Sequence, residues 1–91
     1  MELLFTTHAL RRMLRHRIRS SEVRFVLETG ERIEEYPDDE PFPSYLVFGR
    51  ADARVLHVVA ADAPSGQRIV ITTYEPNTLE WELDFRTRRK R

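Results

Sequence analysis

The hydrophobic pattern of this chain changes its period at Gly30, and this change constrains the fold more than any other feature of the sequence. Before Gly30, apolar residues recur at spacings of three and four, as they do on one face of an amphipathic helix. After Gly30 they follow the two-residue period of strands. We therefore predict an α+β domain in which two N-terminal helices pack on an antiparallel sheet of about four to five strands.

The predicted helices have recognisable ends. Thr6 or Thr7 can cap the first helix, and Ser20 and Ser21 offer a cap for the second, which Gly30 is expected to end in the left-handed conformation. One arc of the first helix is apolar and is expected to face the core: Ala9, Leu10, Met13, Leu14 and Ile18.

Strand-forming residues dominate the remainder of the chain. The predicted strands are 31–36, 45–50, 54–61 and 68–74, and the short linkers between the last three indicate an antiparallel meander. Three prolines make the acidic stretch between the first two strands a rigid loop. Alternation of apolar and charged residues over 79–85 favours a further edge strand.

Length and composition limit the organisation to one domain. A chain of 91 residues with 41% hydrophobic residues can hold one core, which we place in residues 1–86, followed by a basic tail, 87–91, that is expected to fray. Cysteine is absent, which excludes disulfides and thiolate zinc sites. No apolar stretch is long enough to span a bilayer, so we expect a cytoplasmic protein.

Charge is distributed unevenly along the chain. Residues 1–24 hold six arginines and two acidic residues, residues 25–40 hold seven acidic residues and one arginine, and the C-terminal residues are basic again. If the basic ends converge, they form a positive face suited to a nucleic-acid backbone. Charge pairing within the chain is an equally good interpretation.

A series of short motifs carries a resemblance to a known family. The motifs are His8-Ala9, Arg12-Met13, Ile18, Glu22, Gly30, Ile33-Glu34, Tyr36-Pro37, Pro41, Pro43, Gly49, Arg54, Leu56-His57-Val58-Val59, Ile71-Thr72, Tyr74 and Pro76. In this order and spacing, nearly the whole chain resembles the bacterial family called domain of unknown function 4258. That family is similar in layout to the RelE, MqsR and BrnT toxins, and its members often lie beside zinc-finger antitoxins of the MqsA or YgiT type.

The resemblance implies a RelE-like toxin of a type II toxin–antitoxin pair, which cleaves messenger RNA and is silenced by its antitoxin. The expected partners are therefore RNA, including ribosome-bound mRNA, and a cognate antitoxin of the zinc-finger type. The chain departs from the family pattern at His16-Arg17, where the family commonly has Arg-Gly. The helix-end arginine of the family would then be Arg15 or Arg17.

Three residues are candidates for metal-independent RNA cleavage, which needs a base, an acid and fixed cations around the phosphate. His57 interrupts an apolar strand, so it either pairs with a buried partner or faces a cleft. His8 stands at the start of the first helix, where a surface or capping role is equally reasonable. Tyr74 ends a predicted strand and either donates to a phosphate or packs in the core.

Arginines are the candidate phosphate ligands, because a guanidinium binds phosphate through two parallel hydrogen bonds. The candidates are Arg12, Arg15, Arg17 and Arg86. Arg12 and Arg15 share a stripe of the first helix, which in most proteins is simply a solvated face. Trp81 is expected to pack rather than to stack on a base.

Metal and cofactor sites are not expected. The sequence has no glycine-rich phosphate loop, and its histidines lack the spacing of metal ligands. Two alternatives to a nuclease stay open: a noncatalytic module that docks a protein through residues 31–40 and the strand edges, and an RNA-binding protein without cleavage. The sequence leaves a homo-oligomer open as well.

Overall fold

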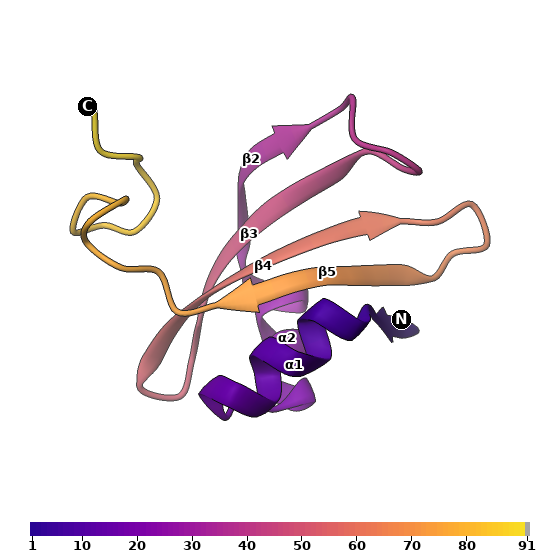
Figure 1. Cartoon of the computed structure of the whole chain (residues 1–91), viewed down its shortest axis with the longest axis horizontal. Helices are drawn as coiled ribbons and strands as arrows, with labels where there is room; N and C mark the ends of the chain where they lie inside the picture. The colour runs from indigo at the N-terminus through magenta and orange to yellow at the C-terminus, as the bar shows by residue number, and fades with distance from the viewer. Residues whose placement is uncertain (91) are drawn as a thin grey trace.

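The structure is a computed structural model that describes residues 1–90, and its centre is a five-stranded sheet with both helices on one face (Figure 1). Along the chain the elements are β1 (Leu3–Phe5), α1 (Thr7–His16), α2 (Ser20–Thr29), β2 (Glu31–Tyr36), β3 (Ser44–Ala51), β4 (Arg54–Asp62) and β5 (Arg68–Tyr74). Across the sheet the strand order is β1-β5-β4-β3-β2. The α+β class, the two helices and the meander are therefore confirmed.

The sheet is mixed, so the prediction of a purely antiparallel sheet is wrong. β1 pairs in parallel with β5, and Leu3 lies opposite Arg68 while Phe5 lies opposite Val70. A strand of three residues is too short to display a period of two. Its partner is also more than 60 residues away in the sequence, so no local signal marked the pairing.

The first helix begins as predicted but is only partly buried. Thr6 is its N-cap, with the side-chain oxygen accepting the Ala9 N–H at 3.0 Å. Ala9 and Met13 are buried, whereas Leu10 and Leu14 are exposed, so the prediction that the whole apolar arc faces the core is wrong. The helix ends at His16 because Arg17 takes the left-handed conformation, with φ of 55°, and the chain turns toward α2.

The second helix differs from the prediction at both ends. Arg19 is its N-cap in place of Ser20 or Ser21, and the Glu22 carboxylate accepts the Arg19 N–H at 2.9 Å. Gly30 is extended rather than left-handed, with φ of −82°. Glycine is required there for another reason: a Cβ atom would collide with the carbonyl oxygens of Phe48 and Val26. Glycine is therefore required at this position by the close approach of β3, and not by a left-handed turn.

One apolar cluster joins the helices to the sheet. It includes Ala9 and Met13 of α1, Val23 and Val26 of α2, and a set of sheet residues. The buried members from the sheet are Tyr45, Val47, Ala51, Leu56, Val58, Ala60 and Val70. On β4, Leu56 and Val58 belong to this cluster, so the intervening His57 points to the other face of the sheet.

Residues 76–90, which we call the C-terminal segment, contain turns in place of the edge strand predicted over 79–85. Trp81 makes a single bridge with Arg88, and Leu79 and Leu83 on either side of it are exposed. The alternation that suggested a strand comes from one buried residue within a series of turns, which Asn77 and Asp84 stabilise by accepting backbone N–H groups.

The basic end of the chain contacts the sheet. Arg86 lies 3.5 Å from a Glu31 oxygen and Arg88 lies 2.8 Å from a Glu34 oxygen, so both pair with β2 rather than extending freely. Arg91, the last residue of the expected tail, lies outside the described residues. None of the helices in residues 1–90 has the length and apolar character needed to cross a membrane.

Candidate functional site

The candidate site is centred on His57, in the middle of the sheet face that the helices leave open. Sheet register places Phe48 of β3 opposite His57 of β4, and His57 opposite Tyr74 of β5. Directly opposed residues of antiparallel strands project from the same face. Pairing of the strands therefore brings together three rings that lie far apart in the sequence, with the His57 and Tyr74 centroids 5.3 Å apart.

Both ring nitrogens of His57 have partners. Nε2 lies 2.7 Å from the carbonyl oxygen of Phe85, and Nδ1 lies 3.3 Å from the Tyr74 hydroxyl. A carbonyl oxygen only accepts, so Nε2 carries the proton and Nδ1 accepts from the phenol. The imidazole is 0% exposed, and this burial lowers the pKa of His57. His57 is therefore a neutral imidazole with a defined tautomer.

Trp81 of the C-terminal segment covers His57. The indole is 1% exposed, and its ring centroid lies 4.6 Å from that of His57 in an edge-on arrangement. Packing was the expected role of Trp81, and it is confirmed. The phenol of Tyr74 is less enclosed than these two rings, and burial raises its pKa. Tyr74 is therefore the member of the cluster that reaches the surface.

Two hydrogen bonds from Arg88 to Glu34 of β2 hold the C-terminal segment in place. The Arg88 guanidinium donates to both oxygens of Glu34, at 2.8 and 3.1 Å, and stacks over Trp81 at 4.5 Å. Burial alone would raise the pKa of Glu34, but hydrogen bonds from Arg88 and Tyr36 hold it below its usual value. The Glu34 carboxylate thus stays ionised and available to Arg88.

Arg12 approaches the cluster from α1. Its guanidinium carbon lies 5.8 Å from the centroid of the Tyr74 ring. Its Nε is the buried side-chain polar atom that has no hydrogen-bond partner within residues 1–90. Because a buried donor without a partner is costly, the unpaired Nε of Arg12 is a feature that the fold by itself does not explain.

The other predicted site residues lie elsewhere. His8 and Arg15 are exposed on α1, and Arg17 is exposed at its end. Among the described residues, no hydrogen bond or ring contact joins His8 to His57. Arg86 stacks over Phe48 at 4.6 Å, on the opposite side of His57 from Tyr74. The structure thus brings together His57, Tyr74 and Arg12, with Arg86 at the margin.

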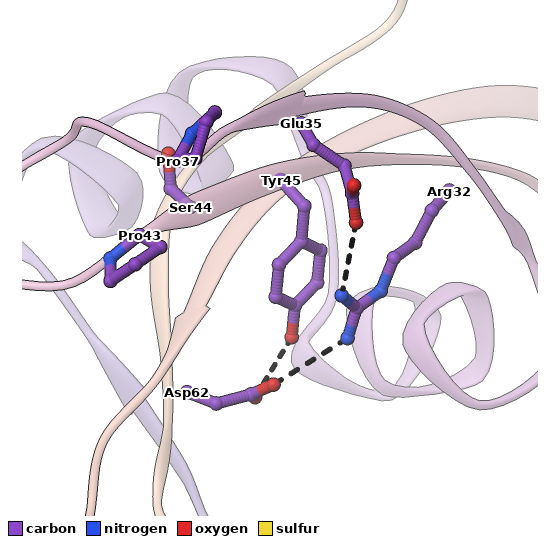
Figure 2. A pocket seen from close by; sticks show the side chains of 7 residues that line it. All are labelled: Arg32, Glu35, Pro37, Pro43, Ser44, Tyr45 and Asp62. Carbon is purple, nitrogen blue, oxygen red and sulfur yellow. Dashed lines mark hydrogen bonds and ion pairs between the residues drawn. The ribbon is translucent and has the colours of Figure 1, made fainter.

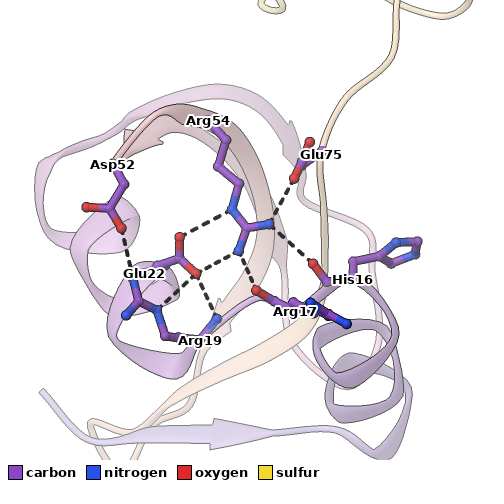
Figure 3. A network of polar contacts seen from close by, with 7 residues as sticks. All are labelled: His16, Arg17, Arg19, Glu22, Asp52, Arg54 and Glu75. Atoms are coloured by element: carbon purple, nitrogen blue, oxygen red, sulfur yellow. Dashed lines mark hydrogen bonds and ion pairs between the residues drawn. The ribbon is translucent and has the colours of Figure 1, made fainter.

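Arg54 organises a second polar network, which fixes the corner between the helices (Figure 3). Its guanidinium donates to Glu22 at 2.7 Å, to Glu75 at 2.9 Å, and to the carbonyl of Arg17 at 2.6 Å. The hydrogen bond from Arg54 is the main cause of the lowered pKa of Glu22. Every carbonyl and carboxylate around Arg54 is used within the fold, so its role is to join β4 to both helices.

A third cluster lines a shallow hollow at the opposite end of the sheet, near Pro37 and Pro43 (Figure 2). The Arg32 guanidinium lies 3.5 Å from the Tyr45 ring centroid, and the Tyr45 hydroxyl donates to Asp62 at 2.8 Å. Burial, followed by the bond to Asp62, raises the pKa of Tyr45 to about 12. Sequence reasoning missed this cluster, because its members are neighbours only across strands.

Among the described residues, no group of three His, Asp or Glu side chains lies close enough together to hold a metal ion.

A comparison with family models matches residues 5–75 to the family described as Domain of unknown function (DUF4258). Comparisons with curated proteins and with solved structures found no significant match. The matched residues include Arg12, His57 and Tyr74, whereas the C-terminal segment that covers His57 begins after the last matched residue.

Proposed function

We propose that this chain, which belongs to the family described as Domain of unknown function (DUF4258), is a metal-independent endoribonuclease toxin of RelE-like type that acts on mRNA. One observation carries the proposal: the convergence of His57, Tyr74 and Arg12 from two strands and a helix. A neutral imidazole, a phenol bonded to it and a cation are the groups that metal-free RNA cleavage uses.

Each member of this cluster has a distinct role in the proposed reaction. The Tyr74 hydroxyl accepts the proton of the RNA 2′-hydroxyl and passes its own proton to Nδ1 of His57, along the 3.3 Å contact between them. The 2′ oxygen then bonds to phosphorus, the bond to the 5′ oxygen breaks, and solvent protonates the 5′ oxygen. The Arg12 guanidinium, which lies 5.8 Å from the centroid of the Tyr74 ring, binds a phosphate oxygen as negative charge develops.

The C-terminal segment must move away from His57 before RNA can reach the whole cluster. It is held by the bond from His57 Nε2 to Phe85 and by the pair of Arg88 with Glu34. Phe85 itself adopts a positive φ of 57°, which is unfavourable for a non-glycine residue. Release of the segment would relieve this conformation, which lowers the cost of opening the site.

A noncatalytic module is the second candidate function, and a specific observation favours it. His57 is fully buried with both nitrogens bonded, as expected of a structural histidine. The exposed arginines of α1 would then bind RNA without cleavage, or the acidic edge strand β2 would dock a protein.

Cleavage of a long single-stranded RNA in the presence of a chelator separates the two functions. The purified chain is assayed alone and with ribosomes, beside Tyr74→Phe, His57→Gln and Arg12→Lys. Arg24→Lys is the matched control, because Arg24 donates to the Met1 carbonyl and lies apart from the cluster. The nuclease predicts cuts that the three site variants lose and the control keeps. Absence of cuts in both assays leaves the binding module.

The same proposal includes the partners and the location of the protein. We propose a cytoplasmic protein whose partner, besides mRNA, is an antitoxin of the zinc-finger type. Co-expression with the product of a neighbouring zinc-finger reading frame tests this. Co-purification of the two proteins with loss of RNA cleavage is the expected result, and full cleavage activity in the presence of that product would exclude it as the antitoxin.

A further inference from the structure

The outer face of α1 exposes an apolar stripe. Leu14 is 82% exposed and Leu10 is 47% exposed, and their spacing of four residues places them on one side of the helix. They border a hollow with a volume of about 520 Å³, which Met13 and Ile18 also line. A leucine pair this exposed beside an apolar hollow is the kind of surface that a partner covers.

Arginines flank this stripe. Arg11 and Arg15 are exposed on α1, and Arg17 lines the hollow. The helix contains no acidic residue, and within residues 1–90 none of these three arginines forms an ion pair. The surface of α1 is therefore apolar along its centre and cationic at its margins, and its best partner is apolar and acidic.

The C-terminal segment carries a surface of that kind. Leu79 is 84% exposed and Leu83 is 79% exposed, again four residues apart. The acidic residues beside them are Glu80, Glu82 and Asp84. Glu82 pairs with Arg89 of the same segment at 3.2 Å and Asp84 accepts two backbone N–H groups, so Glu80 is the one of these three acids that forms no ion pair or side-chain hydrogen bond within residues 1–90. Buried Trp81 anchors the segment, so its leucines are held in place before any partner binds.

These two surfaces lie apart in one chain. The C-terminal segment extends away from the helices (Figure 1), and its Trp81 packs on His57, on the sheet face opposite α1, so the segment of one molecule does not cover the helix of the same molecule. Only a second copy of the chain can bring the two together. Each copy carries both surfaces, and a two-fold arrangement uses each of them twice.

We propose that two copies of this chain form a reciprocal dimer, in which Leu79–Asp84 of each copy docks on Leu10, Leu14 and the flanking arginines of the other. The leucines supply apolar burial, and the pairing of Glu80 with the arginines of α1 sets the orientation. This association requires neither RNA nor cleavage, so it stands or falls independently of the nuclease.

Sedimentation equilibrium of the full chain over a range of concentrations tests the dimer. The expected result is a mass that rises from monomer to dimer, with weaker association at about 1 M salt than at about 0.1 M, because screening lengths fall from ~10 Å to ~3 Å. A monomer at every concentration would overturn the proposal. Growth beyond the dimer would overturn the two-fold arrangement.

Leucine variants locate the interface. Leu14→Ser and Leu83→Ser should each raise the dissociation constant about tenfold or more, since each removes a large apolar side chain from the contact. Leu4→Ser is the matched control, because Leu4 is also partly exposed but lies on β1. Equal weakening by all three variants, or weakening by Leu14→Ser without any effect of Leu83→Ser, contradicts the proposed contact and points to a different occupant of α1.

A charge exchange tests the orientation. Arg11→Glu and Glu80→Arg should each weaken the dimer, and the double variant should recover most of the wild-type association. Thermal unfolding of each variant shows whether the fold is retained. Failure of the double variant to recover, while both single variants stay folded and weak, would show that these residues do not face each other across the interface.

Discussion

The side chain of His57 connects the sheet to the C-terminal segment. Its Nε2–H donates to Phe85 and its ring packs against Trp81 and Tyr74. Protonation of the buried ring would add a positive charge to it. The groups bonded to its nitrogens, the Phe85 carbonyl at Nε2 and the Tyr74 phenol at Nδ1, are both neutral. The free energy of the fold therefore depends on the protonation state of this histidine.

We predict that the chain loses stability as pH falls below about 6.5, the ordinary pKa of histidine. Burial lowers the pKa of His57 in the folded state, so the unfolded chain binds this proton first and protonation favours unfolding. The stabilisation is complete above the unfolded pKa and is lost as pH falls toward the folded pKa. Urea unfolding between pH 7.5 and about 5 measures the slope.

His57→Gln is the control for this pH dependence. A glutamine amide can still donate to the Phe85 carbonyl, but it does not titrate over this range. The variant should therefore lose stability at neutral pH and show a flatter dependence between pH 7.5 and about 5. The same slope in both proteins would show that another group is responsible.

We expect Arg54 to stabilise the fold more than an arginine in an exposed ion pair does. The Glu22 carboxylate that it binds is 7% exposed, so Arg54→Ala leaves a largely buried charge without its main partner. We predict a loss of about 3–5 kcal/mol in the free energy of unfolding. Arg32→Ala removes an arginine from pairs whose side chains are between 47% and 70% exposed, and should cost less than ~1 kcal/mol. Chemical denaturation of the two variants compares them directly.

At the scale of elements, close approach between α2 and β3 decides the residue at position 30. A Cβ atom on Gly30 would meet the Phe48 and Val26 carbonyl oxygens, whereas one on Gly66 would meet nothing within 4 Å. We predict that Gly30→Ala costs about 3 kcal/mol and Gly66→Ala about 1 kcal/mol, the latter from its positive φ alone. Thermal unfolding distinguishes the two, and equal losses would contradict the packing at Gly30.

The C-terminal segment is an element without regular secondary structure, and its attachment can be followed through Trp81. Trp81 is the sole tryptophan of the chain, so its fluorescence reports directly on whether the segment covers His57. Arg88→Gln removes the charged pair with Glu34 and the stacking on the indole. We predict a red-shifted emission and faster hydrogen exchange in residues 76–90, with the sheet core unchanged.

Arg89→Gln is the matched control for Arg88→Gln. Arg89 belongs to the same segment, but its side chain bonds to Thr78 and Glu82 within the segment rather than to the sheet. Its loss should leave the emission of Trp81 close to that of the wild type. An identical red shift in both variants would mean that the contact with β2 does not hold the segment.

At the scale of the whole molecule, the two basic regions of the chain differ: among the described residues, the C-terminal arginines form ion pairs, and the exposed arginines of α1 do not. The basic C-terminus pairs with the acidic strand β2, through Arg86 with Glu31 and Arg88 with Glu34. Internal charge pairing, one of the two interpretations of the sequence, therefore holds at this end. Arg11 and Arg15 of α1 form no ion pair within residues 1–90 and are exposed to solvent, on a helix that packs against the opposite face of the sheet from His57.

Local residue patterns were enough to predict the helices, the meander of three strands and the burial of Trp81. Caps, periodicity and turn residues act within a few positions of one another, so one sequence contains their full signal. The same reasoning failed for Leu3–Phe5, whose partner strand is distant, and for residues 79–85, where one buried side chain imitated an alternating strand. It also assigned Leu10 and Leu14 to the core, because the width of an apolar arc on a helix does not indicate which of its residues the sheet will cover.

The sequence by itself determined the α+β class and the residue types available for chemistry, because both depend on local order and composition. Only the tertiary structure decided that His57 meets Tyr74 and Arg12, that Arg54 meets Glu22, and that His8 stays apart from His57. Strand register and the docking of α1 set these distances, and both follow from packing between segments that are far apart along the chain. Covering of His57 by Trp81 is likewise a product of that packing.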